Sequence, residues 1–417
     1  MRFFVLIVQK YGGSSIADAE CIMRVAKRIT SSFSKGNKLV VVLSAQGDTT
    51  DDLYEKAKEL NTKASRRELD MLVTTGEQQS VALMAMAIHK LGYPAISLTA
   101  GQVGIHATST YGNARIKNIE TSRIATELDK NNIVLVAGFQ GVNRYGDVTA
   151  LGRGASDTTA VAIAAVLHAD LCEIYSDVNG VYTANPSIVK NAKKIDEISY
   201  EEMLELASLG VQVLHNRAVE MAKRHRVKLV VRSSFTEEEG TLVKEEVPNM
   251  EKLYVSGIAV DDKIARISIV GIEDRPGMAY QIFSLLAKEK ISVDIILQSI
   301  GRNATKDISF TIHIDNLQQS MEILQAHRDA IGFDMISYDD NVAKLSIVGA
   351  GMASNSGVAS MMFEALYDCG VNINMISTSE IKISVLIDKK NKEKAMISVH
   401  DKFINNQIEF FKGGGQI

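Results

Sequence analysis

Short runs of aliphatic and β-branched residues alternate with longer amphipathic stretches over the first half of the chain. The runs have the length and composition of buried strands, and they lie at 3–8, 38–45, 95–100, 132–139, 171–177 and 228–234. Between them, apolar residues recur at helical spacing, for example over 16–29 and 201–210. Buried strands that alternate with helices predict an α/β domain, with a mostly parallel sheet covered on both faces. Ligands bind such sheets at the carboxyl ends of the strands, so the loops there are the first candidates for a site.

The pattern changes after residue 235. The stretch 236–250 is acidic and shows no clear period, which is typical of a linker. Beyond it, the sequence 267–286 repeats as 345–366, and each copy continues into two strand-like runs and a second helix. This order predicts two ferredoxin-like βαββαβ units. We therefore expect domains at about 1–245, 255–335 and 340–417, with strands that can be exchanged between the two repeats.

Composition narrows the class of protein. The 417 residues carry a formal charge of −4 with both signs dispersed, so the sequence does not predict a nucleic-acid surface. The three cysteines, Cys21, Cys172 and Cys369, are far apart, which favours a reducing compartment over a disulfide framework or metal cluster. The apolar run 3–8 is too short for a signal peptide or membrane span and predicts a buried strand. We expect a cytoplasmic protein without membrane contact.

Two of the expected loops have residues suited to phosphates and polar ligands. Lys10 and the adjacent Gly12 and Gly13 follow the first strand, where a close backbone approach and N–H groups could hold an anion. A tight turn between a strand and a helix would explain the same glycines. Ser44 and Thr50 follow the second strand, where their hydroxyls could position a ligand, or where the threonine could cap the next helix.

Three further loops add charged groups. Glu77 precedes an apolar helix, and it could either bind a cation or complement the helix dipole. Arg153 lies between two glycines ahead of Ser156 and Asp157, and the guanidinium of an arginine in this loop could bind a substrate carboxylate. Helix capping would explain Asp157, but it does not explain the Gly-Arg-Gly that precedes it. The turn-rich stretch 175–187 is consistent with a hairpin, although a hairpin does not explain why Asp177 and Tyr182 frame the turns.

Taken together, these stretches resemble the aspartokinase family within the amino-acid kinase fold. KYGGSS resembles its Lys-Phe-Gly-Gly-Thr-Ser loop, and SAQGDTTDDL its Ser-Ala-Met-Gly-x-Thr-Thr segment. LGRGASDTTA is similar to its Gly-Arg-Gly-Gly-Ser-Asp segment, and SDVNGVYTANP to its nucleotide loop. The repeats are similar to the tandem ACT domains that follow its kinase domain. The likeness spans nearly the whole chain in the same order.

The resemblance implies ATP-dependent phosphorylation of the β-carboxylate of L-aspartate to 4-phospho-L-aspartate, the first step toward lysine, threonine and methionine. Mg²⁺ would be bound mainly through the ATP phosphates rather than by a protein metal site. The implied ATP-binding residues are Lys10, Tyr11, Gly12, Gly13, Ser44, Ser176, Asp177, Tyr182 and Gln212. The implied aspartate-binding residues are Thr50, Glu77, Arg153 and Ser156, and the catalytic pair is Lys10 and Asp157. Glu77 would pair with the substrate ammonium and Arg153 with a carboxylate.

For the repeats, the resemblance implies feedback binding of lysine, threonine or both. The implied effector residues are Asp274, Met278, Ala279, Gln298 and Asn374. Capping of turns or pairing at sheet edges would explain the same polar residues. ACT domains generally pair across subunits, so the resemblance also implies a homodimer or a larger assembly.

The sequence departs from the family pattern where cations are expected. Gln212 replaces the lysine of the late helix, and Ser187 replaces the arginine of an Asp-Pro-Arg segment. Ala155 replaces a glycine, and Asn355-Ser356 replaces a His-Pro pair. Lys190, Lys193 and Lys194 lie downstream and could substitute. Two alternatives stay open: a catalytically weak paralogue that senses amino acids as a regulatory subunit, and a kinase for another acidic amino acid.

Overall fold

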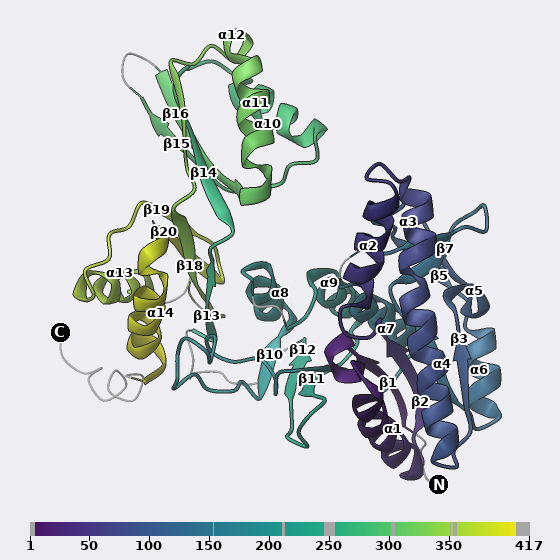
Figure 1. The fold of residues 1–417 in the computed structure, drawn as a ribbon. Helices are drawn as coiled ribbons and strands as arrows, with labels where there is room; N and C mark the ends of the chain where they lie inside the picture. The colour runs from purple at the N-terminus through teal and green to yellow at the C-terminus, as the bar shows by residue number, and fades with distance from the viewer. Residues whose placement is uncertain are drawn as a thin grey trace. The chain divides into compact units, whose positions relative to one another are not determined.

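The structure, a computed structural model, describes residues 5–152, 154–210, 213–245, 255–301, 305–350, 352 and 357–405. Two compact units are present, and each is considered by itself (Figure 1). The first unit comprises the chain up to Tyr182 and again from Lys193 to the end of the α/β region. The second comprises the short segment Thr183–Ala192 and the whole C-terminal region.

An eight-stranded sheet forms the centre of the first unit, in the order β10-β12-β11-β9-β1-β2-β6-β3. All six strands predicted for this unit lie side by side in it, and their mutual pairings are parallel, which confirms the expected fold class. The bounds of these six strands are β1 Leu6–Tyr11, β2 Lys38–Leu43, β3 Ala95–Leu98, β6 Ile133–Ala137, β9 Leu171–Ser176 and β11 Leu229–Ser233.

Helices cover both faces of the sheet. On one face, α1 (Ala19–Ser34) and α4 (Thr75–Lys90) share an apolar core with alternate residues of the central strands. The Asp18 side chain caps α1 by accepting a hydrogen bond of 2.8 Å from the Cys21 N–H. On the opposite face, α7 (Ala155–Val166) packs on β1, β2 and β9 and against α9 (Asn216–His225). The remaining helices of this unit are α2 Thr49–Leu60, α3 Arg66–Val73, α5 Ala100–Val103, α6 Ser122–Asp129 and α8 Tyr200–Ser208.

Two parts of the first unit differ from the sequence-based expectation. The stretch 236–250, interpreted as a linker, contributes strand β12 (Thr241–Lys244), which pairs with β11 and with β10 (Glu197–Ser199). A second sheet was not predicted, because its strands of three or four residues are too short to show a period. Its strands are β4 Ile105–Ala107, β5 Ile116–Ile119, β7 Gln140–Val142 and β8 Val148–Ala150.

The second unit contains two four-stranded sheets, ordered β15-β16-β14-β17 and β13-β18-β20-β19. Strand β13 (Gly257–Asp261) precedes the first repeat in sequence, yet it pairs with β18 of the second repeat, so one strand is exchanged. The bounds for the first repeat are β14 Ile264–Glu273, α10 Met278–Lys288, β15 Val293–Ile300, β16 Thr305–His313, α11 Leu317–Ala326, α12 Arg328–Ile331 and β17 Met335–Asp339. Those for the second are β18 Val342–Val348, α13 Val358–Asp368, β19 Met375–Thr378, β20 Lys382–Asp388 and α14 Lys392–His400.

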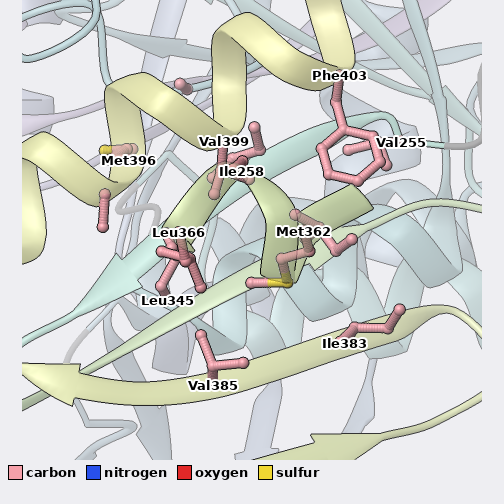
Figure 2. Packing of buried hydrophobic residues seen from close by; sticks show 14 of the residues in the cluster. Val255, Ile258, Leu345, Met362, Leu366, Ile383, Val385, Met396, Val399 and Phe403 are labelled. Atoms are coloured by element: carbon pink, nitrogen blue, oxygen red, sulfur yellow. The ribbon is translucent and has the colours of Figure 1, made fainter. Parts of the chain in front are cut away.

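The sheet of the second repeat is closed on one face by α13 and α14, and Figure 2 shows the resulting core. Leu345, Ile383 and Val385 of the sheet lie against Met362 and Leu366 of α13. Met396 and Val399 of α14 belong to the same cluster (Figure 2). The same cluster also includes residues of the Thr183–Ala192 segment, so this piece of chain is structurally part of the second unit.

Candidate functional site

The carboxyl ends of β1, β2 and β6 bring three loops together. A Cβ on Gly13 would lie 2.7 Å from the Ala45 carbonyl oxygen, so only glycine permits this approach. The Gly47 N–H then donates a hydrogen bond of 3.1 Å to the Gly13 carbonyl oxygen. A Cβ on Gly138 would likewise lie 2.9 Å from the Cβ of Ser156, at the start of α7. The glycines therefore allow the three loops to pack closely at this edge of the sheet.

Lys10 and Asp157 form an ion pair at the centre of this edge. The Lys10 Nζ lies 2.7 Å from the Asp157 Oδ1, with both side chains largely buried, at 13% and 10% exposure. Asp157 does not cap α7, because Gly154 occupies the N-cap position and Asp157 lies in the first turn. A Cβ on Gly12 would lie 3.4 Å from the Lys10 Nζ, so the ammonium lies beside the Gly12 backbone. A positive charge is thus held directly beside the glycine loop.

Gly154, one of the two glycines that flank position 153, packs against His215. Gly152 and Gly154 both adopt positive φ values, of 90° and 67°. A Cβ on Gly154 would lie 2.3 Å from the Cδ2 of His215, the N-cap residue of α9. Burial lowers the pKa of His215, so this ring is neutral at physiological pH. His215 was missed at the sequence level because a helix-capping histidine gives no signal of what it contacts.

Replacing Gly154 with alanine should therefore destabilise the protein well beyond the cost of its positive φ. The matched control is Gly146→Ala, because Gly146 has a φ of 83° but nothing within 4 Å of its Cβ position. We expect the control to lose about 1–2 kcal/mol and Gly154→Ala to lose clearly more, measured by chemical unfolding. Equal losses would show that His215 does not constrain the loop.

Glu77 lies buried at the start of α4, with 3% of its surface exposed. Its Oε1 accepts a hydrogen bond of 3.1 Å from the Ala45 N–H, whereas its Oε2 has no hydrogen-bond partner within the described residues. Burial raises the pKa of Glu77 to about 7. A buried carboxylate with one unpaired oxygen is suited to bind a cation such as a substrate ammonium.

The hydroxyl residues of the second loop belong to the segment whose Ala45 N–H bonds to this carboxylate. Ser44 is half-buried directly after β2, and its N–H donates to the Tyr11 carbonyl oxygen at 3.2 Å. Thr50 lies in the first turn of α2, whose N-cap residue is Asp48, so the alternative explanation of Thr50 as a helix cap is wrong. Gly76 packs against Ala45 in the same region, which brings the start of α4 to the end of β2.

The candidate nucleotide loop follows β9 and is linked to the glycine loop. The Gly12 N–H donates to the Tyr175 carbonyl oxygen at 3.3 Å, one residue before Ser176. Ser176 Oγ donates to the Asp177 carboxylate at 2.8 Å, and Asp177 is exposed. Tyr182 is half-buried and forms an isolated antiparallel bridge with Lys194, so the stretch is an open loop rather than the hairpin considered above.

Buried hydroxyls beside these loops were not singled out from the sequence. Ser15 Oγ and Ser234 Oγ are both fully buried and have no hydrogen-bond partner among the residues that the structure describes. Ser15 follows the two glycines of the first loop, and the Ser234 N–H donates to the Ser176 carbonyl oxygen at 2.8 Å. Serine is common in loops of all kinds, so neither position stood out in the pattern.

Two predicted residues, Arg153 and Gln212, lie outside the described residues. Ser187 is described, and its side chain donates to Asn185 Oδ1 at 2.8 Å in a local turn. Of the three lysines considered as substitutes for the expected cations, Lys194 is the one whose backbone pairs with the nucleotide loop, and its Nζ donates to the Glu239 carbonyl oxygen. Lys190 and Lys193 are exposed.

A polar hollow of about 700 Å³ lies on the opposite face of the sheet from Lys10. Gln9, Glu173 and Tyr175 line it together with Arg24 and Arg28 of α1. Because successive residues of a strand point to opposite faces, Gln9 and Lys10 are on different sides of β1. This hollow is therefore separate from the loops described above.

A smaller hollow of about 360 Å³ lies in the first repeat. It is lined by four of the predicted effector residues, Asp274, Met278, Ala279 and Gln298, and also by Lys306, which was not predicted. Lys306 Nζ lies 3.5 Å from the Asp274 Oδ2, so the hollow contains charges of both signs. Asn374 does not line it: this residue directly precedes β19 in the second repeat, where its side chain donates to Asp388 at 3.2 Å.

Family models and relatives agree on one classification. The amino acid kinase family model matches residues 5–233, and an ACT domain model matches residues 267–327 and 345–403. The chain is 51% identical to an aspartokinase of Geobacillus stearothermophilus over 95% of this chain and 97% of that protein. The aspartate kinase of Clostridium acetobutylicum is 26% identical, with a TM-score of 0.79 over 95% of this chain and 100% of that one. Aspartokinase III of Escherichia coli, at 23% identity and a TM-score of 0.82 over 95% and 99% of the two chains, has the same fold.

Proposed function

We propose that this chain, which belongs to the aspartokinase family, transfers the γ-phosphoryl group of ATP to the β-carboxylate of L-aspartate. The observation that carries the proposal is the joint placement of Lys10, Asp157 and Glu77 around one edge of the sheet. An ionised carboxylate is already a nucleophile, so the protein needs no strong base. It must position two anions and neutralise the charge that develops between them.

The geometry suggests a role for each described group. The Gly12-Gly13 backbone and Lys10 would hold the β- and γ-phosphates, and Asp157 would orient the Lys10 ammonium. The unpaired oxygen of Glu77 would accept the substrate ammonium. Ser176, Asp177 and Tyr182 would contact the nucleoside. Arg153 and Thr50 are assigned to the substrate carboxylates on sequence grounds.

Mg²⁺ would enter with ATP. Within the described residues, no group of three histidine, cysteine, aspartate or glutamate side chains is arranged to hold a metal ion. A Mg²⁺ that is bound with ATP generally keeps several phosphate and water oxygens as ligands. No helix within the described part of the chain is long and apolar enough to cross a bilayer.

The hollow in the first repeat is the proposed effector site. Lysine and threonine both carry an ammonium and a carboxylate, which suit Asp274 and Lys306 respectively, and Gln298 can bond to either group. The α10 N-terminus beside Met278 also favours a carboxylate. The strand β15 exposes Ile296 at 49% and Ile300 at 86%, an apolar edge consistent with pairing to a second subunit.

The test is a direct assay with purified protein, Mg-ATP and L-aspartate, with the acyl phosphate trapped as a hydroxamate. Aspartate-dependent product that falls on addition of lysine or threonine would support both proposals. A complete lack of aspartate-dependent product at saturating substrates would contradict the catalytic proposal. Product with L-glutamate in place of aspartate would favour a kinase for another acidic amino acid.

The departures from the family sequence predict a slow enzyme. Losing one preorganised donor to a transition state costs roughly 3 kcal/mol, about a hundredfold in rate. Gln212→Lys should therefore raise kcat by at least tenfold, while Gln319→Lys on α11 should leave kcat unchanged. An unchanged kcat for Gln212→Lys would show that another group, such as Lys194, already supplies the charge. A basal rate too low to detect, with normal ATP binding, would favour the alternative of an amino-acid-sensing regulatory subunit.

A further inference from the structure

The larger hollow, on the α1 face of the sheet, is not used by the proposed reaction. Its volume of about 700 Å³ is in the usual range for small-molecule sites. Gln9 of β1 and Glu173 and Tyr175 of β9 line it from the sheet, and side chains of α1 and of the segment 232–237 complete the lining. All of these residues belong to the first unit. The chemistry of this lining therefore needs an explanation separate from that of the catalytic loops.

Glu173 is the buried carboxylate of the lining, and both of its oxygens are already bonded. Its side chain is 7% exposed. The Oε2 accepts hydrogen bonds of 2.8 Å from the Gln9 amide and 3.2 Å from the Tyr175 hydroxyl. The Oε1 lies 3.3 Å from the Arg232 Nη1, so an arginine offsets the charge. Glu173 therefore gives no reason to expect a bound cation here.

Arg24 of α1, by contrast, has few hydrogen-bond partners. Its Cζ lies 4.6 Å from the centre of the Phe235 ring, which holds the guanidinium in place. Within the described residues its hydrogen-bond acceptor is the Cys21 Sγ, 3.2 Å from Nη2, and a thiol sulfur is a weak acceptor. The Nε atoms of Arg24 and Arg232 are both buried without a partner in the part of the chain that the structure describes. The unpaired buried groups of this lining are thus donors, which indicates a ligand rich in acceptor oxygens.

Basic residues also outnumber acidic ones around the hollow. The five basic residues are Arg24, Lys27, Arg28, Lys35 and Arg232, and the three acidic ones are Glu20, Glu173 and Glu237. Two of the acids are paired with arginines, because the Arg28 Nη2 lies 2.9 Å from the Glu237 Oε1 in addition to the contact of Glu173 with Arg232. The lining has a formal excess of two positive charges, which favours an anion.

We propose that this hollow binds a phosphate group, either free or carried by a small organic molecule, with Arg24 as its principal contact. A phosphate monoester carries a charge of about −1.5 to −2 at neutral pH and has three strong acceptor oxygens. These properties match the charge excess and the unpaired donors, whereas a carboxylate offers one charge and two oxygens. The planar guanidinium of an arginine is well suited to bidentate binding of phosphate. The inference goes beyond the proposed function and does not depend on it.

The test titrates inorganic phosphate into the full chain by calorimetry and compares wild type with Arg24→Gln. The matched control is Arg224→Gln, because Arg224 is an exposed arginine of α9, which packs against α7 on the opposite face of the sheet. Loss of a hydrogen bond to a charged group weakens binding by about tenfold or more. The Kd for phosphate should therefore rise at least tenfold in Arg24→Gln and stay unchanged in Arg224→Gln. Lys27→Gln, which removes an exposed charge of the lining, should raise it about two- to fivefold.

Two further titrations separate this site from the catalytic loops and identify the source of the phosphate. Lys10→Met should leave phosphate binding in the hollow intact, because Lys10 is on the other face of β1. Glucose 6-phosphate is a phosphate ester without a nucleoside. A Kd for it below that of inorganic phosphate would assign the site to phosphate esters, and an equal or higher Kd would assign it to free phosphate. The inference would be overturned by an unchanged Kd in both Arg24→Gln and Lys27→Gln, by loss of binding in Lys10→Met, or by no binding of either compound at millimolar concentration.

Discussion

Replacement of Lys10 with methionine is expected to lower kcat at least a hundredfold. The Lys10 ammonium is held 2.7 Å from Asp157 and beside the glycine loop, so its position is fixed before ATP binds. A preorganised cation of this kind contributes about 3–4 kcal/mol to the transition state. The family's other cation positions are occupied by Gln212 and Ser187, so less charge is available to compensate. The measurement is kcat at saturating ATP and aspartate by the hydroxamate assay.

The control for Lys10→Met is Lys38→Met. Lys38 also belongs to a central strand and pairs with Asp129 at 2.9 Å, but it lies at the opposite end of the sheet from the loops. Removing Lys10 leaves Asp157 without its partner, so thermal unfolding must show that the variant is folded. A folded Lys10→Met protein with kcat within tenfold of wild type would contradict the role assigned to Lys10.

The parallel sheet and its strand-end loops could be predicted because their signals are local. Six buried apolar runs, each followed by polar or glycine-rich residues, specify the strands and the edge where ligands bind. The ion pair of Lys10 with Asp157 could not be predicted by spacing, because it joins positions 147 residues apart in the chain (157 − 10). The resemblance to a family brought these two residues together, and the structure supplies the distance.

Other features depend on tertiary contacts that leave no periodic signal. Strand β12 was not predicted because the segment around it is acidic and has no clear period. Its antiparallel partner β11 also pairs in parallel with β9, so the sequence of β11 gave no sign of a further neighbour. The requirement for glycine at position 154 depends on His215, sixty-one positions later (215 − 154). The segment Thr183–Ala192 predicts no more than a loop in the sequence, whereas its membership of the second unit depends on the side chains that bury Val189.

Glu77 is expected to give aspartate binding a pH dependence centred near neutrality. Burial raises the pKa of Glu77 to about 7 in the unliganded protein, and the ionised form is the one that pairs with an ammonium. The ratio kcat/KM for aspartate should therefore rise about tenfold per pH unit below pH 7 and level off above it. At saturating aspartate, the bound ammonium favours the ionised carboxylate, so kcat should show this transition at lower pH.

The variant Glu77→Gln should abolish that transition and raise the KM for aspartate at least tenfold, with the KM for ATP unchanged. The control is Glu127→Gln, because Glu127 is also a buried carboxylate but pairs with Arg123 of α6 and with Lys130, the C-cap residue of that helix. A pH profile of kcat/KM that persists in Glu77→Gln would assign the titration to another group.

The same carboxyl group makes an independent prediction for stability. Because burial raises its pKa, the folded protein binds the Glu77 proton more tightly than the unfolded chain does. Stability of the unliganded protein should therefore fall as the pH rises from about 4.5 to about 7. Glu77→Gln should remove this fall and be more stable than wild type above pH 7, while it binds aspartate less well. A variant that loses aspartate affinity without that gain in stability would mean that glutamine disrupts the Ala45 contact instead of removing a buried charge. The opposite signs of the two effects therefore distinguish a binding carboxylate from a structural one.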